Sequence, residues 1–199
     1  YYGHDGLKRK ALGFCMTIAH AEFMAEEFNK RGIPSIALSG GDKVSKRESY
    51  TKLLEAEDSD LEVIFTVDIF NEGIDIPGVN LVMMLRPTQS SIVFTQQLGR
   101  GLRKKDNKEF LTVLDFIGNY SKSFLIAIAL NGRRFYDKDS VKTSVKRNFS
   151  DLPGATHIQL DEVSKQQILE QIDFENFSTL AYLKNTYNEF KNLNSGRIP

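Results

Sequence analysis

The sequence has little of several features that would point to a particular class of protein. It contains one cysteine in 199 residues, Cys15, so no internal disulfide can form, as is typical of a reducing compartment such as the cytoplasm. Lysine plus arginine and aspartate plus glutamate number 26 each, which excludes a strongly basic arm or an acidic tail. The longest strongly apolar run, residues 124–130, is far too short to span a bilayer. The single cysteine and three histidines also lack the spacing of a zinc site.

Strand-like and helix-like segments alternate over the first two-thirds of the chain. The apolar or β-branched runs expected to form strands are residues 11–16, 35–38, 63–67, 81–85 and 110–116. The segments with helical spacing of apolar residues are 21–28, 46–56, 92–98 and 120–130. Strands that alternate with helices predict an α/β fold, in which helices cover both faces of a parallel sheet.

The pattern changes near Gly132. Residues 133–153 are polar and basic with little periodicity, which predicts a linker, and two helices follow, one starting at Asp161 and one over residues 180–190. We therefore predict one domain over residues 1–135 and a linker with a small helical extension over residues 136–199. Because the chain begins Tyr-Tyr and not with Met, we expect it to be a piece of a longer protein.

The most informative stretch is residues 96–103, Gln-Gln-Leu-Gly-Arg-Gly-Leu-Arg. Arg100 and Arg103 are three residues apart, so on a helical turn they point the same way. Guanidinium groups bind phosphate oxygens bidentately and stay charged, which suits the charge on a transferring γ-phosphoryl group. Taken alone, this stretch is explained about as well by a solvated basic turn.

Two further stretches lie where predicted strands end. Residues 66–77 contain Thr66, Gly73 and Asp75 and follow a buried strand, and open α/β sheets place their ligand loops at that end. A strand, a tight loop and a proline stop would explain the same residues. Thr17 stands where another strand gives way to a helix and is a plausible N-cap, and helix N-termini bind phosphate.

The order and spacing of these stretches resemble the second RecA-like domain of superfamily-two helicases and translocases. Residues 14–22 are similar to motif IV of that family, residues 64–77 to motif V, and residues 96–103 match the Gln-x-x-Gly-Arg-x-x-Arg of motif VI at every defined position. The resemblance covers residues 8–130. The runs 67–73 and 85–91 look like the DNA-directed branch that includes restriction-enzyme motor subunits.

The resemblance implies a site for ATP in a cleft between this domain and a P-loop domain. Arg100 and Arg103 match arginine fingers, and Gln96 matches the glutamine that organises the γ-phosphate and the attacking water. Gly73 and Asp75 match positions near the nucleotide.

The resemblance also implies a nucleic-acid partner. Thr17 and Thr66 match positions that hold nucleic-acid phosphates, and Ser39 and Gly40 occupy a loop that often does the same. The expected partner is DNA, most simply double-stranded and held by its backbone, so affinity should fall with salt.

No Gly-x-x-x-x-Gly-Lys-Ser/Thr sequence occurs in the 199 residues. Residues 158–162 resemble an apolar strand that ends in the paired acids of a magnesium-binding motif, but Asp161 is better interpreted as a helix N-cap. We therefore expect ATP and Mg²⁺ in the full-length protein, with Mg²⁺ held by the missing P-loop domain, and no metal, cofactor or ATP hydrolysis by this chain alone. The alternatives are a non-catalytic α/β module that binds nucleic acid or a partner, and a nucleotide- or sugar-binding enzyme.

Overall fold

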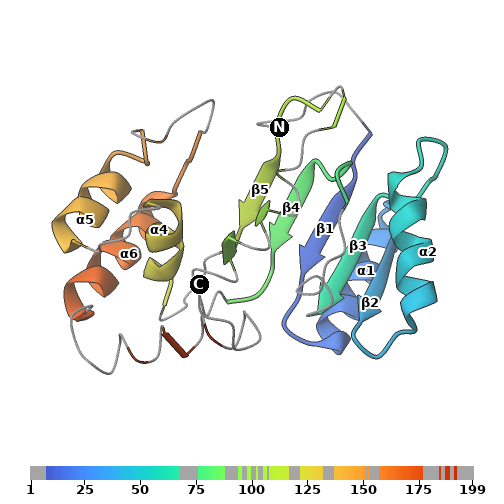
Figure 1. Cartoon of the computed structure of the whole chain (residues 1–199), viewed down its shortest axis with the longest axis horizontal. Coiled ribbons are helices and arrows are strands. Elements are labelled where there is room, and N and C mark those ends of the chain that lie inside the picture. The colour runs from blue at the N-terminus through green and yellow to red at the C-terminus, as the bar shows by residue number, and fades with distance from the viewer. Residues whose placement is uncertain are drawn as a thin grey trace. The chain divides into compact units, whose positions relative to one another are not determined.

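A computed structural model of the 199-residue chain describes residues 8–67, 76–87, 94–95, 98–99, 102, 105–106, 108–116, 122–131, 137–150, 152, 157–176, 184, 187–188 and 191. The chain divides into two compact units (Figure 1). The first comprises Tyr1–Pro87 and Thr95–Phe116, and the second comprises Thr88–Phe94 and Ile117–Pro199.

The first unit is built on a sheet of five strands that all run parallel. In chain order they are β1 (Ala11–Phe14), β2 (Ser35–Ser39), β3 (Val63–Val67), β4 (Leu81–Met84) and β5 (Thr112–Asp115). Their order across the sheet is β2-β3-β1-β4-β5, so β1 is central, and Leu12 lies opposite Ile64 on one side and Val82 on the other. The five predicted strands and their parallel arrangement are therefore confirmed.

Two helices connect the first three strands and cover opposite faces of the sheet. Helix α1 (Ile18–Lys30) links β1 to the edge strand β2, and α2 (Val44–Glu55) links β2 back to β3. Because the two connections run in opposite directions across the sheet, right-handed crossovers place one helix on each face. Figure 1 shows α1 behind the strands and α2 in front of them.

Small residues let α1 lie close to the sheet. Ala21 and Ala25 are its buried residues, and they pack with Ala11, Val63 and Phe65. Further along the helix, the ring of Phe28 meets the ring of Phe65 edge-on, with centroids 4.9 Å apart and planes at 79°.

Polar contacts hold the amino-terminal edge of the sheet. The Lys10 Nζ donates hydrogen bonds to the carbonyl oxygens of Glu55 and Ala56 at 2.6 and 2.9 Å, which satisfies acceptors at the end of α2. The Lys10 backbone N–H donates to Asn80 Oδ1 at 2.9 Å. These bonds are structural, and the opposite edge of the sheet is the one available for ligand loops.

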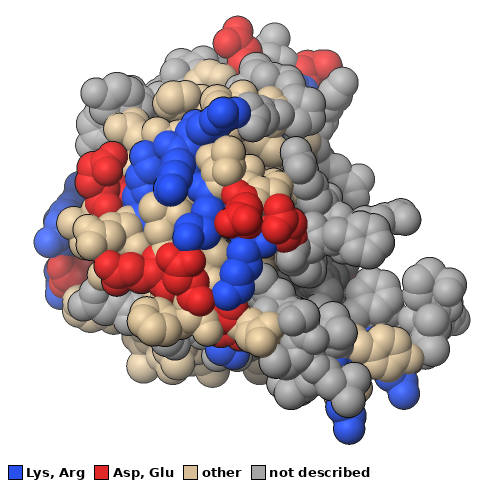
Figure 2. All heavy atoms as spheres, turned by 90° about the vertical axis from the view of Figure 1, so that its left-hand side faces the viewer, with Lys and Arg blue, Asp and Glu red and all other residues tan. Residues whose placement is uncertain are grey.

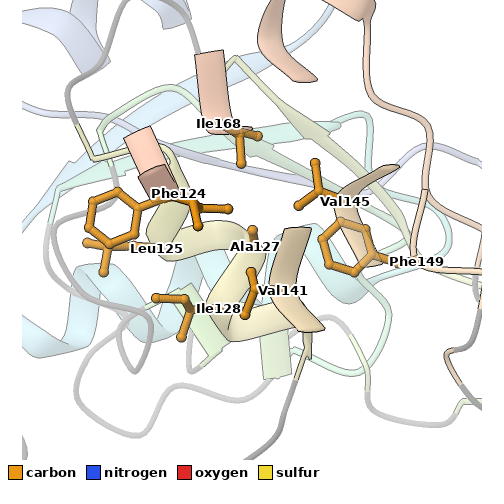
Figure 3. Packing of buried hydrophobic residues seen from close by; sticks show 9 residues of the cluster. Phe124, Leu125, Ala127, Ile128, Val141, Val145, Phe149 and Ile168 are labelled. Carbon is orange, nitrogen blue, oxygen red and sulfur yellow. The ribbon is translucent and has the colours of Figure 1, made fainter. Parts of the chain in front are cut away.

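The second unit contains a core formed by three helices, α4 (Phe124–Asn131), α5 (Lys138–Lys146) and α6 (Glu162–Phe174). The side chains that meet in this core are Phe124, Leu125, Ala127, Ile128, Val141, Val145, Phe149, Ile168 and Ile172 (Figure 3). The backbone N–H of Phe124 also donates to Gln171 Oε1 at 3.2 Å, which ties α4 to α6.

Helix α5 corrects the prediction of a linker over residues 133–153. Val141 and Val145, four residues apart, are fully buried, and Asp137 caps the helix by accepting from the Ser140 N–H at 3.1 Å. Two apolar residues give too weak a periodicity to indicate a helix in the sequence, and packing against α4 and α6 supplies the stability instead. Asn148 and Phe149 then adopt left-handed φ angles of 49° and 54°, and the turn places the Phe149 ring in the core.

Helix α4 also lies elsewhere than expected, because it belongs to the second core and not to the sheet. The limits of 1–135 and 136–199 stay a prediction, and these contacts favour a boundary before α4. The expected helices over 92–98 and 180–190 fall mostly outside the described residues. No helix in the described part of the chain is long and apolar enough to cross a bilayer.

Candidate functional site

The predicted phosphate-binding residues that the structure describes lie at or just after the ends of three neighbouring strands, at the carboxyl edge of the sheet. Thr17 comes after β1, Ser39 ends β2 with Gly40 next to it, and Thr66 lies near the end of β3. The register pairs Thr66 with Phe14 on one side and Leu38 on the other, so β3 lies between the strands that lead to the two loops. The parallel sheet therefore brings these segments to one edge.

Thr17 is the N-cap of α1, as predicted. Its side chain accepts a hydrogen bond from the His20 N–H at 3.1 Å, and its carbonyl accepts from the Ala21 N–H at 3.0 Å. Thr17 is exposed, so the first turn of α1 presents backbone N–H groups near an accessible hydroxyl. Such a helix start suits a phosphate oxygen.

The loop after β2 is a tight turn in which both donors of Ser39 are already engaged. The Asp42 carboxylate accepts from the Ser39 N–H at 2.8 Å and from the Ser39 hydroxyl at 3.3 Å. Lys46 binds the other oxygen of Asp42 at 2.6 Å, and these hydrogen bonds, that of Lys46 first, lower the pKa of Asp42. Nothing lies within 4 Å of a Cβ placed at Gly40. A phosphate at Ser39 would thus take over bonds that Asp42 now accepts.

Sequence reasoning missed the part played by Asp42. Its signal is an aspartate three residues after Ser39, with Lys46 four residues further on, a spacing that favours a carboxylate-held turn leading into a helix.

Thr66 occupies a different environment from the one expected of a surface ligand. It is 1% exposed, and among the described residues its hydroxyl has no hydrogen-bond partner. Its carbonyl accepts from the Cys15 N–H at 2.8 Å, which belongs to the pairing of β3 with β1. The role of Thr66 in phosphate binding stays a prediction, and the structure places its side chain in the protein interior.

Asp115 is a second group that sequence reasoning missed. It ends β5 beside Met84 of β4, and burial raises its pKa to about 6. Its Oδ2 has no hydrogen-bond partner in the described part of the molecule. The sequence signal is an acid at the end of an apolar strand, Thr-Val-Leu-Asp. Asp115 lies in the same cross-strand row as Thr66, Phe14 and Met84, so both polar groups without a partner face the same side of the sheet.

The five residues predicted to act on ATP lie outside the described residues, and their roles stay predictions: Gln96, Arg100, Arg103, Gly73 and Asp75. Next to them, the Leu102 N–H donates to the Leu98 carbonyl at 3.2 Å, a helical hydrogen bond. The described residues contain no group of three His, Cys, Asp or Glu that could hold a metal ion.

Comparison with known proteins matches residues 4–105 to the helicase conserved C-terminal domain, just over half of the chain. The chain belongs to this helicase C-terminal domain family. Its relatives are superfamily-two helicases that include a type I restriction enzyme subunit, and the expected RecA-like α/β fold is confirmed.

Two relatives of this helicase C-terminal domain are much longer proteins, of which the chain covers only a part. The chain is 28% identical over 163 residues to the IRC3 protein of Saccharomyces cerevisiae, provisionally named as an ATP-dependent helicase. It is 30% identical over 125 residues to the type I restriction enzyme EcoKI endonuclease subunit of Escherichia coli. The matches cover 82% and 57% of this chain but only 22% and 11% of those proteins.

Among solved structures, the C-terminal part of the Fun30 ATPase domain superposes with a TM-score of 0.51. The superposition covers 83% of this chain and 48% of that one, and the two sequences are 15% identical. At this identity the likeness concerns the fold alone.

Proposed function

We propose that this helicase C-terminal domain is the second motor domain of an ATP-dependent DNA helicase or translocase. The observation that carries the proposal is the placement of Thr17 and the Ser39–Gly40 loop at the carboxyl edge of the parallel sheet, in a chain that also has the full Gln-x-x-Gly-Arg-x-x-Arg pattern at residues 96–103. In this proposal one edge of the domain serves both nucleotide and nucleic acid.

Arg100 and Arg103 act as arginine fingers on the γ-phosphate of ATP, and Gln96 orients the attacking water. Gly73 and Asp75 approach the nucleotide. Arginine suits this role because its charge persists at any relevant pH and spreads over a planar fork of donors. Mg²⁺ is assigned to the carboxylates of a P-loop domain, where the metal ion would neutralise charge on the phosphates of ATP. This chain by itself turns over no ATP.

The nucleic acid is held by its phosphates. Thr17 offers the N-terminus of α1 and Gly40 offers an unobstructed backbone, while Ser39 donates its hydroxyl hydrogen bond to a phosphate in place of Asp42. Thr66 contributes only if the side chains that bury its hydroxyl move away from it. Contacts of this kind position a DNA backbone, most simply that of a duplex, without reading its sequence. ATP-driven approach and separation of two such domains then steps the strand.

The nucleotide half of the proposal is tested on the full-length protein that joins this chain to a P-loop domain. Arg103→Ala should lower DNA-stimulated ATP turnover about a thousandfold or more, since arginine fingers contribute that much to related phosphoryl transfer. Lys104→Ala is the matched control, because it removes the neighbouring positive charge that lies outside the motif. Equal turnover in Arg103→Ala and the wild type would refute the arginine-finger role and favour a non-catalytic binding module.

The nucleic-acid half is tested at Thr17 with two variants of equal capping strength. Aspartate and asparagine are both good N-caps, so Thr17→Asp and Thr17→Asn should both preserve α1. Only Thr17→Asp adds a negative charge beside the expected phosphate. DNA affinity should therefore fall for Thr17→Asp and stay near wild type for Thr17→Asn, as measured by fluorescence anisotropy with labelled duplex. An equal response of the two variants would place the DNA away from this helix.

A further inference from the structure

Three hydrogen-bond donors meet at the carboxylate of Asp42, in the loop that follows β2. The N–H and the hydroxyl of Ser39 donate to one carboxylate oxygen at 2.8 and 3.3 Å, and the Lys46 ammonium group donates to the other at 2.6 Å. A backbone N–H, a hydroxyl and a lysine are the kinds of donor with which proteins hold the phosphates of a nucleic-acid backbone. We name Ser39, Asp42 and Lys46 the β2 loop cluster, in which a carboxylate occupies the place of an external anion.

The β2 loop cluster is accessible to a ligand. The Lys46 side chain is 48% exposed and the Asp42 side chain is 21% exposed. Nothing lies within 4 Å of a Cβ placed at Gly40, so the loop leaves room beside the cluster. A phosphate can therefore reach the donors once the Asp42 side chain turns away, and a partly exposed ion pair such as Lys46–Asp42 costs little to break.

Lys46 occupies a poor place for a cation that serves only stability. It lies in the first turn of α2, where the backbone N–H groups carry partial positive charge and where no residue is acidic. Residues 39–48 contain three Lys or Arg and two Asp or Glu, so a displaced Asp42 leaves the donors with an excess of positive charge. The hydrogen bonds from Lys46 and from the Ser39 N–H lower the pKa of Asp42, so the carboxylate stays charged at neutral pH.

We propose that Asp42 is a built-in competitor of the nucleic-acid backbone, and that Lys46 is a phosphate ligand which Asp42 releases when a strand binds. This inference rests on the proposed function, because it takes the Ser39–Gly40 loop to be a phosphate contact and adds how that contact is regulated. Without nucleic acid, Asp42 holds all three donors. A bound phosphate takes them over, and Asp42 turns to solvent. The competition weakens this single contact, which allows a domain that moves along a strand to release one phosphate and take the next.

The test measures binding of a fluorescein-labelled 20-base-pair DNA duplex to the 199-residue chain by anisotropy between 50 and 200 mM salt. Asp42→Asn keeps a side-chain oxygen that can accept from the Ser39 N–H, so the turn should remain, and it removes the charge that holds Lys46. The variant should bind the duplex about fivefold more tightly at 100 mM salt, the upper end for the loss of one such ion pair.

A second substitution shows whether Lys46 is the released ligand. Lys46→Gln removes one phosphate contact, so it should reduce the slope of log affinity against log salt by about 0.9. Added to Asp42→Asn, it should bring the affinity back to that of the wild type or below. A double variant that keeps the whole gain would refute the role of Lys46.

Two variants with the same change of charge are matched controls. Asp173→Asn breaks an ion pair of the same length, 2.6 Å to Lys142, in the second unit. Figure 2 shows the face that carries α5 and α6, where Lys and Arg side chains lie beside those of Asp and Glu. Glu48→Gln removes an exposed acid of α2 itself. Both controls should bind the duplex within about 1.5-fold of the wild type.

The outcomes separate this inference from the proposed function. A wild type that does not bind the duplex would refute both. A wild type that binds, with unchanged or weaker binding by a folded Asp42→Asn, would refute the competition alone. Equal gains in Asp42→Asn and the two controls would also refute it, because net charge would then explain them. If Asp42→Asn proves unfolded by circular dichroism, Lys46→Gln in the wild-type background decides, and an unchanged salt slope overturns the proposal.

Discussion

Among the glycines that the structure describes, Gly13 is the one where an added carbon would meet its neighbours most closely. A Cβ at Gly13 would lie 2.4 and 2.7 Å from Cδ1 and Cε1 of the Phe65 ring, whereas carbon atoms in contact are normally about 3.5–4.0 Å apart. The strand register pins Gly13 between Phe65 of β3 and Met83 of β4, and Phe28 of α1 packs against the ring at 4.9 Å. The ring must therefore move by about 1 Å into a filled core.

We expect Gly13→Ala to lower the free energy of unfolding by about 3 kcal/mol, near the upper end of the usual cost of overpacking. The measurement is urea denaturation of the 199-residue chain followed by far-ultraviolet circular dichroism, since the sequence has no tryptophan. Gly40→Ala is the control, because nothing lies within 4 Å of its added carbon, and it should cost less than about 0.5 kcal/mol.

A double-mutant cycle identifies the atoms responsible. If the Phe65 ring causes the loss, Phe65→Leu should recover part of it in the Gly13→Ala background, with a coupling energy of at least about 1 kcal/mol. A Gly13→Ala variant as stable as Gly40→Ala, or a cycle with additive losses, would refute the close contact between Gly13 and Phe65.

Three further predictions concern buried or strained groups. Burial raises the pKa of Asp115 to about 6 in the folded chain, above its value in the unfolded chain. The unfolded chain therefore loses this proton first, and the folded protein loses stability as pH rises from about 4 to about 6. Asp115→Asn should therefore raise the free energy of unfolding by about 2 kcal/mol at pH 7 and leave it unchanged at pH 4, and a gain of equal size at both values would contradict this cause. Burial also raises the pKa of the Cys15 thiol to about 11, so Ellman's reagent at pH 8 should react only as the chain unfolds in urea, and rapid labelling without denaturant would show an accessible thiol. Asn148 has a φ of 49°, a left-handed angle that glycine adopts without strain and alanine does not. Asn148→Gly should therefore keep or raise the thermal midpoint of the second unit, while Asn148→Ala should lower the free energy of unfolding by about 1 kcal/mol. A glycine variant less stable than the alanine variant would show that the turn relaxes freely.

Much of the first unit could be predicted from local patterns in the sequence. The five strands appear as short apolar runs because strands buried on both faces need apolar side chains on both sides. The N-caps at Thr17 and Asp161 could be predicted because a side-chain oxygen at a helix start bonds backbone only three residues away, as the 3.0 Å contact from the Ser164 N–H to Asp161 shows. The same contact confirms that the paired acids at residues 158–162 start a helix.

Other features depended on partners distant in the chain. Helix α5 has too few apolar residues to stand out, and its identity as a helix depends on α4 and α6 covering Val141 and Val145. Thr66 looks like an available hydroxyl in the sequence, yet the strands on either side of it and the cover of the sheet bury it. The hydrogen bonds of Lys138 and Lys142 to Asp173 join residues 35 and 31 positions apart in the chain.

The sequence by itself determined the order of the five strands and of the helices between the first three, the two N-caps and the likeness to a helicase domain, because each of these depends on side chains that lie close together along the chain. Only the tertiary structure decided which strands are neighbours, that α4 packs with α5 and α6, and which polar groups are buried or near another charge. Those outcomes depend on burial and on electrostatic interactions between groups far apart in sequence, and such energies exist only once the chain has folded.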